Sequence, residues 1–426
     1  MTFDTSNFIN LPANARILWA VYFVDFIFSG IVRGFLPGVF SNVLYFVRGV
    51  VVVILVLLFL NSGRLLNSFS RFFVFLAFLL SGFQLVLLIN SELNLINFFY
   101  GLYLYVIPLI GVAMSETIDL RLILLNYFLI LKIALPINFL VCLLQTVFNF
   151  APLYSAGFGT GLYSSNGIQR ATGTFSSSVG FSLFLSLSLI ILIGLQLLDL
   201  KVVPLHMWLI VLFLVLVSGS RTTIFNIGYL LVLTYFMKGI KLHFYSKRIF
   251  SRVFWGLLFL ISVTFPLVSS VYYAGLYRFT SANEIDPPIS RLLFQLSLEN
   301  HEFRLFGEGL GTRALGSVNN SDRRVLFADW IEFDNARILV EAGVIFLVLI
   351  WFAKILFVFN VINARTKLSR GERTFLNVGL VGLMPYLLFA QIFGQATLSG
   401  GVFLLMYLLL SLFNGSLYSN RNTKKL

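Results

Sequence analysis

Apolar runs of about 20 residues recur along the whole of this chain, and this repetition constrains the fold more than any other feature. Each run is long enough to cross a bilayer as a helix. Only 11% of the residues are charged, against about 25% in a typical soluble chain. The pattern predicts an all-α, polytopic protein in which residues 1–426 form a single membrane domain.

The runs predict about twelve transmembrane helices, because a closed helix satisfies its own backbone in lipid. The expected spans lie near residues 16–32, 41–60, 72–90, 96–114, 122–148, 176–197, 203–217, 222–237, 252–271, 335–358, 375–393 and 401–416. Between the ninth and tenth spans lies a long loop, residues 272–334, which we expect outside the cytoplasm.

Basic residues indicate the orientation of these spans. They concentrate in residues 61–71, 238–252, 363–374 and 421–426. Lys and Arg accumulate in cytoplasmic loops, and an even number of spans places all four segments on one side. The sequence therefore predicts that both termini are cytoplasmic. Membrane insertion then accounts for the net charge of +13, and we expect no nucleic-acid partner.

Three segments of the opposite face carry distinctive polar residues. Residues 149–175 are rich in Gly and Ser and hold one charge, Arg170, and the turn SGSR holds Arg221. The long loop contains nine acidic residues and no lysine. Its arginines are Arg278, Arg291, Arg304, Arg313, Arg323 and Arg324.

Arginine favours phosphate ligands, because its planar fork donates two parallel hydrogen bonds and stays charged. Arg170 and Arg221 have no acidic residue nearby in sequence, so we interpret both as phosphate-binding residues. For most loop arginines, salt bridges to the loop's own acids are the favoured interpretation, with phosphate binding as the alternative. Ser218–Ser220 suit a tight turn and a helix N-terminus, which adds N–H donors beside Arg221. A capped helical hairpin would explain these serines without explaining the arginine.

The end of the long loop holds two further motifs. In FRLFGEGLGTRALG, residues 303–316, we interpret the glycines as turn geometry, since no Rossmann unit surrounds them. In ADWIEFDNARILVEAG, residues 328–343, Asp334 suits a helix cap followed by an Arg337–Glu341 pair. Alternatively, Asp334 is a general base, with His301, Glu302 and Glu308 as further candidates. No clustered His, Cys and carboxylate pattern occurs, so we expect no metal site.

Charged residues also occur within the predicted spans. Asp25, Arg48 and Lys132 lie deep in apolar runs, where charges mark pathways or buried pairs. We favour a structural pair of Asp25 with Arg48 or with Lys132. A contact of Arg48 with a lipid diphosphate is the alternative.

Four motifs together resemble the superfamily of O-antigen polymerases (Wzy-type) and O-antigen ligases, which are integral membrane glycosyltransferases. They are RATGTF at 170–175, SGSRTT at 218–223, GEGLGT at 307–312 and DNARILVEAG at 334–343. Their order, their spacing and the long loop match as well, over roughly residues 140–360. Ligases usually place a histidine in the last motif, so Asp334-Asn335 favours a polymerase.

The resemblance implies a GT-C-like fold in a bacterial cytoplasmic (inner) membrane. The implied partners are an undecaprenyl-diphosphate-linked donor and acceptor, membrane lipids and a chain-length regulator protein, with no cofactor. It implies catalytic roles for Asp334, Arg221 and Arg170. The expected substrate-binding residues are Arg291, Arg304, Arg313, Arg337, His301, Glu308 and Arg48.

Two rival functions remain open at this point. A ligase would transfer the lipid-linked glycan to lipid A–core. A twelve-span polysaccharide transporter or flippase would place its site near the midplane between repeated halves. No repeated halves are evident in this chain, and its distinctive polar residues lie near one surface. The sequence therefore favours a polymerase of O-antigen, capsule or exopolysaccharide repeats.

Overall fold

The chain is a helical, multi-pass membrane protein. The computed structural model describes residues 13–36, 46–61, 66, 68–90, 93, 95–114, 120–147, 164–165, 168–169, 171–175, 178–218, 228, 230, 305–310, 312, 334–364 and 368–388. Within these ranges, six apolar helical stretches are long enough to cross a bilayer, and Val47–Asn61 and Leu205–Val217 are shorter apolar helices.

The first half of the chain supplies most of these helices. They are α1 (Ala13–Phe35), α3 (Val47–Asn61), α4 (Ser68–Ile89), α5 (Leu95–Gly101), the π-helical turn η2 (Leu102–Val106), α6 (Ile107–Met114) and α7 (Leu120–Val147). The later elements are the two-residue strands β1 (Ser164–Ser165) and β2 (Ile168–Gln169), then α8 (Ser178–Leu197), α9 (Leu205–Val217), α14 (Asp334–Ala364) and α15 (Arg370–Leu388). The strands pair antiparallel.

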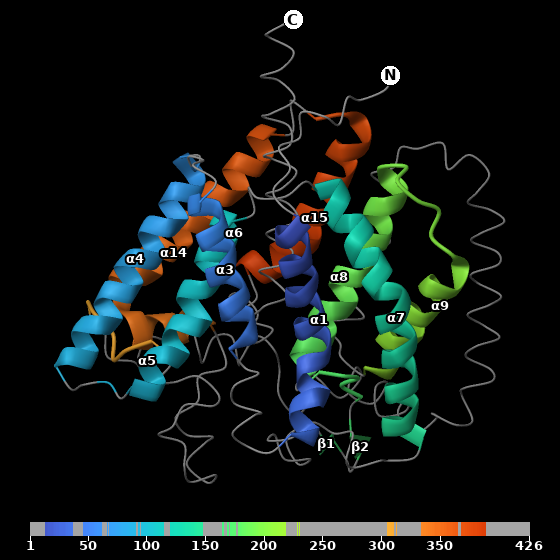
Figure 1. Cartoon of the computed structure of the whole chain (residues 1–426), viewed down its shortest axis with the longest axis horizontal. Coiled ribbons are helices and arrows are strands. Elements are labelled where there is room, and N and C mark those ends of the chain that lie inside the picture. The colour runs from blue at the N-terminus through green and yellow to red at the C-terminus, as the bar shows by residue number, and fades with distance from the viewer. Residues whose placement is uncertain are drawn as a thin grey trace, which may run out of the picture.

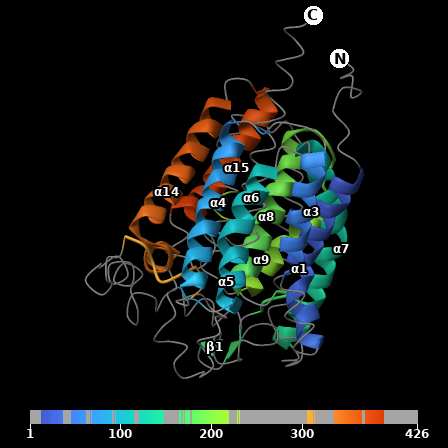
Figure 2. The same ribbon diagram turned by 60° about the vertical axis from the view of Figure 1, so that its left-hand side comes forward.

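Helix α8 forms the centre of one group of helices (Figures 1 and 2). It packs against α7, α9 and α15, and every residue from Phe181 to Leu195 is buried. A helix that is apolar on all sides is stable only when other elements surround it. Gly194 provides the close contact with α15, since a Cβ there would lie 2.6 Å from the ring of Phe375.

A second group consists of α3, α4, α6 and α14 (Figure 1). Helix α4 packs along α6 and also contacts α14, and α3 joins this group to the first through α1. The outward faces of α4 and α14 carry exposed apolar side chains such as Phe78 and Val348. Such faces suit contact with lipid chains.

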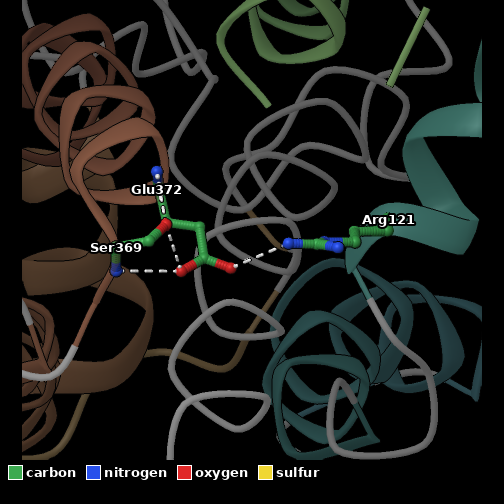
Figure 3. Close-up of polar contacts among 3 residues, drawn as sticks. All are labelled: Arg121, Ser369 and Glu372. Atoms are coloured by element: carbon green, nitrogen blue, oxygen red, sulfur yellow. Dashed lines mark hydrogen bonds and ion pairs between the residues drawn. The ribbon is translucent and has the colours of Figure 1, made fainter. Parts of the chain in front are cut away.

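One end of the bundle carries a cluster of described basic residues, Arg71, Arg121, Arg370 and Arg373. Ser369 and Glu372 form a capping box at the start of α15, in which Glu372 Oε2 accepts from the Ser369 hydroxyl at 2.8 Å. The same carboxylate pairs with Arg121 at the start of α7, at 3.6 Å (Figure 3). We call this the basic end. It includes the described parts of two of the basic segments from the sequence, at Arg71 and at Arg370–Arg373.

The helices agree closely with the spans expected from the sequence. Runs 16–32, 72–90, 122–148 and 176–197 correspond to α1, α4, α7 and α8. Run 96–114 is a single span that contains the π-turn η2, and run 335–358 is part of the longer α14. The expected spans 252–271 and 401–416 lie outside the part of the chain that the structure describes, and so does the span 222–237 except for residues 228 and 230.

Candidate functional site

Two of the four motifs are joined directly. Residues 305–310, here called the glycine segment, lie along the first turns of α14. The backbone N–H of Glu308 donates to the carbonyl of Val340, and that of Gly309 donates to the carbonyl of Glu341, both at 2.9 Å. The motifs GEGLGT and DNARILVEAG therefore contact each other, although the bonded residues lie 32 positions apart in sequence.

A break in α14 makes this contact possible. Gly343 has φ 87° and ψ 175°, which interrupts the helix after its first nine residues. In a continuous helix, the carbonyls of residues 340 and 341 would accept from residues 344 and 345. The interruption leaves these carbonyls to the glycine segment. A Cβ at Gly343 would collide with the backbone of Leu305 and Phe306, so only glycine fits.

Glycines on the other side of the contact confirm the expectation of special backbone geometry in this motif. Gly309 has φ 116°, a region that glycine occupies readily. Gly307 lies so close to the backbone of Glu341 and Ala342 that a Cβ would overlap them. The glycines are thus used for a turn and for close backbone contact.

Gln84 of α4 fixes the far end of the glycine segment. Its amide oxygen accepts from the N–H of Leu310 at 2.8 Å, and its amide nitrogen donates to the carbonyl of Leu310 at 2.9 Å. Leu310 itself is fully buried. Gly101, the last residue of α5, allows this approach, because a Cβ there would overlap the carbonyl of Leu310.

A buried polar network lies beside this contact. The hydroxyl of Tyr105, in η2, donates to Glu341 Oε2, and Arg337 Nε donates to the same hydroxyl at 3.1 Å. The guanidinium of Arg337 lies 5.6 Å from the centre of the Tyr105 ring. Arg337 is 2% exposed and Glu341 is fully buried. The Arg337–Glu341 pair considered from the sequence is thus linked through a tyrosine from another helix.

The RATGTF motif forms a second anchored turn. Gln145 of α7 accepts from the N–H groups of Thr172 and Gly173 and donates to the carbonyl of Gly173, each at 3.0 Å. Thr174 donates its N–H to Asn138 at 3.0 Å, and its hydroxyl donates to the carbonyl of Ile27 in α1 at 2.6 Å. The turn is therefore tied to α1 and α7.

The described parts of all four motifs lie at the same end of the bundle. The 171–175 turn meets the C-terminal ends of α1 and α7, and Ser218 of the SGSRTT motif ends α9. The glycine segment and the start of α14 lie at this end as well, opposite the basic end (Figures 1 and 2). We call it the motif end.

The structure pairs Asp25 with Arg48, one of the two partners expected from the sequence. Arg48 Nε lies 3.0 Å from Asp25 Oδ2, and both side chains are largely buried. The guanidinium also lies 5.7 Å from the centre of the Tyr103 ring in η2. Lys132 instead lies over the ring of Phe128, at 5.0 Å. Structural pairing, the favoured interpretation of these charges, is confirmed for Asp25 and Arg48.

The remaining predicted site residues divide into two sets. Glu308 is half-buried in the glycine segment, and Asp334 begins α14, although its side chain is outside the described part. The others lie outside the described residues: Arg170, Arg221, Arg291, His301, Arg304 and Arg313. The structure thus joins Glu308, Arg337 and the start of α14 in one region. Phosphate binding by Arg170 and Arg221 stays a prediction.

Sequence reasoning missed the residues that hold the motifs in place. Gln84, Asn138 and Gln145 lie in apolar runs, where an amide side chain needs a polar partner, and this was a usable signal. Tyr105 gave no comparable signal, since tyrosine is common in membrane helices. Comparisons with protein-family models, with curated proteins and with solved structures found no match to this chain.

Proposed function

We propose that this protein is a membrane glycosyltransferase that polymerises undecaprenyl-diphosphate-linked oligosaccharide repeats. The observation that carries the proposal is the junction of the glycine segment with the start of α14 at the motif end. Two motifs that were matched only by order and spacing in sequence are in direct contact, which supports the proposal that they belong to one site.

The proposed chemistry balances with groups of the chain alone. A hydroxyl oxygen of the acceptor repeat attacks the anomeric carbon of the donor glycan. The bond from that carbon to the diphosphate oxygen breaks, and undecaprenyl diphosphate leaves. A carboxylate accepts the hydroxyl proton. Arg170 and Arg221 neutralise the charge that develops on the leaving diphosphate.

Asp334 is our first choice for the proton acceptor, and Glu308 is the second. Asp334 stands at the first residue of α14, and Glu308 is held to the same helix by its backbone bond to Val340. The side chain of Glu308 is partly accessible, as a general base must be to reach a substrate hydroxyl.

A transporter or flippase remains the second candidate, because of one observation. Helix α14 is interrupted at Gly343 beside the buried charges Arg337 and Glu341. Broken helices with buried charges also form substrate sites in transporters. The start of α14 lies at one end of the bundle, however, and Glu341 is only about 10 Å from Asp334 along the helix axis. The network therefore lies nearer that end than a transporter site at the midplane would.

Deletion of the gene in its host distinguishes these functions. Loss of a polymerase leaves surface glycans of a single repeat, and loss of a ligase removes glycan from lipid A–core. Loss of a flippase leaves lipid-linked repeats on the cytoplasmic face. We expect the surface glycan of the deletion strain to run on a gel as a single repeat. The wild-type gene should restore long glycan chains. Unchanged glycan length in the deletion strain would refute the proposal.

Complementation then tests the acceptor of the proton. Asp334→Asn keeps most helix-capping ability but removes the base. At a normal protein level it should reduce the amount of polymer at least tenfold. This is a cautious bound, because loss of a general base typically reduces rates by about a hundredfold or more. Glu308→Gln is the parallel variant. Wild-type polymer from well-expressed Asp334→Asn together with loss in Glu308→Gln would transfer the role to Glu308.

A further inference from the structure

The glycine segment depends on the position of a single residue of α14. Glu341 accepts from the N–H of Gly309 with its backbone carbonyl, and it accepts from the hydroxyl of Tyr105 with its side chain. Tyr105 belongs to η2, so Glu341 joins three parts of the chain that are distant in sequence. A shift of Glu341 would move the backbone partners of Glu308 and Gly309.

The form of η2 places Tyr105 at this point. A π-turn inserts an extra residue into a helix and redirects the side chains around it, and such turns recur at functional sites. Here η2 presents Tyr103 to Arg48 and Tyr105 to Arg337 and Glu341. Gly101, which immediately precedes η2, contacts Leu310 of the glycine segment. Residues 101–106 therefore contact Arg48, the Arg337–Glu341 network and the glycine segment.

A purely apolar contact would join α14 to η2 without burying a carboxylate and a guanidinium. Burial of charged groups is costly, and well-packed apolar residues of similar volume are often equally stabilising or better. The polar network adds a defined orientation of α14 relative to η2. Arg337 Nε, the Tyr105 hydroxyl and Glu341 Oε2 have a fixed donor–acceptor order, which sets the rotation of the first segment of α14 about its axis.

We infer that Tyr105, Arg337 and Glu341 are positioning residues that orient the start of α14 and the glycine segment for the transfer reaction. The inference rests on the proposed function. None of the three contacts substrate in this role. They fix the orientation of the half-helix that carries Asp334 and the placement of Glu308 on it.

The test removes one hydroxyl and compares it with a matched control. Tyr105→Phe keeps the ring and its contact with the Arg337 guanidinium but loses both hydrogen bonds. Tyr127→Phe is the control, because Tyr127 is a buried tyrosine of α7 whose hydroxyl has no hydrogen-bond partner among the described residues. Tyr127→Phe likewise removes a tyrosine hydroxyl, but from α7, which belongs to the group of helices around α8.

The first measurement does not depend on any activity. Leu310→Cys is introduced after the native Cys142, which is buried, is changed to Ala. A hydrophilic maleimide should label this buried position slowly in membranes. Tyr105→Phe should accelerate labelling by about tenfold or more, because the loss of even one hydrogen bond to a charged group corresponds to about that factor, and Tyr127→Phe should not. Equal labelling in all three proteins would overturn the inference. If Tyr105→Phe does not accumulate, Glu341→Gln takes its place.

The second measurement is the rate of repeat addition in proteoliposomes, with lipid-linked repeats extracted from the deletion strain. Tyr105→Phe should reduce the rate at saturating donor about tenfold, with the half-saturating donor concentration and the thermal midpoint near wild type. Faster labelling with an unchanged rate would overturn the positioning role. If wild-type protein adds no repeats, the proposed function fails, and the labelling alone decides whether the network holds the glycine segment.

Discussion

The side chain of Gln84 forms hydrogen bonds with both the N–H and the carbonyl of Leu310, a residue 226 positions later in the chain. One amide group thus satisfies both backbone polar groups of a buried residue in the glycine segment. The segment is a loop by sequence, yet Gly307, Gly309 and Leu310 are buried. Its structure follows from partners on α4 and α14 rather than from its own residues.

Replacement of Gln84 tests how much this contact contributes. Gln84→Leu keeps the volume but leaves the N–H and carbonyl of Leu310 without these partners. We expect the free energy of unfolding in detergent to fall by about 2–6 kcal/mol, because each unsatisfied buried group costs about 1–3 kcal/mol. Gln196→Leu, at an exposed position near the end of α8, is the control and should change it by less than about 0.5 kcal/mol. Similar stability of the two variants would argue against the contact.

The break in α14 makes a second prediction. Gly343→Ala places a Cβ against the backbone of Leu305 and Phe306 at a positive φ. We expect the glycine segment to separate from α14, which should raise the labelling rate of Leu310→Cys and lower the thermal midpoint. Gly82→Ala on α4 is the matched control, since a Cβ there meets nothing within 4 Å. It should be neutral or stabilising by up to about 1 kcal/mol, the difference in helix propensity.

The helices were predictable from sequence because lipid imposes one local rule on the backbone. A run such as 122–148 has no alternative to a helix in a bilayer, and α7 occupies residues Leu120–Val147. The special backbone of the GEGLGT motif was also predictable, because Gly309 and Gly307 serve a turn and a close approach.

The contacts between motifs were not predictable in the same way. The bond of Gly309 to Glu341 joins two segments through backbone atoms, which carry no signature in the side chains. The π-turn η2 is likewise formed where Tyr103 and Tyr105 meet Arg48 and Arg337 from other helices. Both features depend on tertiary packing, so a single sequence gives only the glycines and the charges that permit them.

The buried ion pair makes a third prediction. Arg48→Met leaves Asp25 without this charged partner, which should lower stability by about 3–5 kcal/mol. Arg48→Met combined with Asp25→Leu should recover most of that loss, because a buried pair is often replaceable by apolar residues. The measurement is a double-mutant cycle of unfolding in detergent. Recovered stability together with normal glycan chains would assign Arg48 to structure, whereas lost chains in the stable double variant would support a contact with the donor diphosphate.

The orientation of the bundle can be tested with single cysteines. Asn90 is exposed at the motif end after α4, and Lys201 is exposed at the basic end after α8. With Cys142 buried, the background should not react. An impermeant maleimide should label Asn90→Cys in intact cells and Lys201→Cys only after permeabilisation, because basic loops remain in the cytoplasm. The opposite result would place the motif end inside the cell and exclude the proposed reaction.

Arg221 provides the sharpest prediction for the proposed chemistry. It lies outside the described residues and follows Ser218, where α9 has ended. If it holds the donor diphosphate, the shape of its side chain matters as well as its charge. Arg221→Lys keeps the charge but loses the bidentate fork. Arg221→Ala loses both, and removal of one such group costs about 3–4 kcal/mol of transition-state stabilisation.

We therefore expect no detectable polymer from Arg221→Ala and strongly reduced polymer from Arg221→Lys, with both proteins inserted at wild-type levels. The same order should hold at Arg170. Arg323→Lys is the control, because we assign Arg323 to salt bridges, in which lysine substitutes well. If Arg221 only anchors a hairpin at the lipid headgroups, lysine should serve equally, since its long side chain reaches the interface as well. Full chain length from Arg221→Lys would thus favour the anchor over the diphosphate clamp.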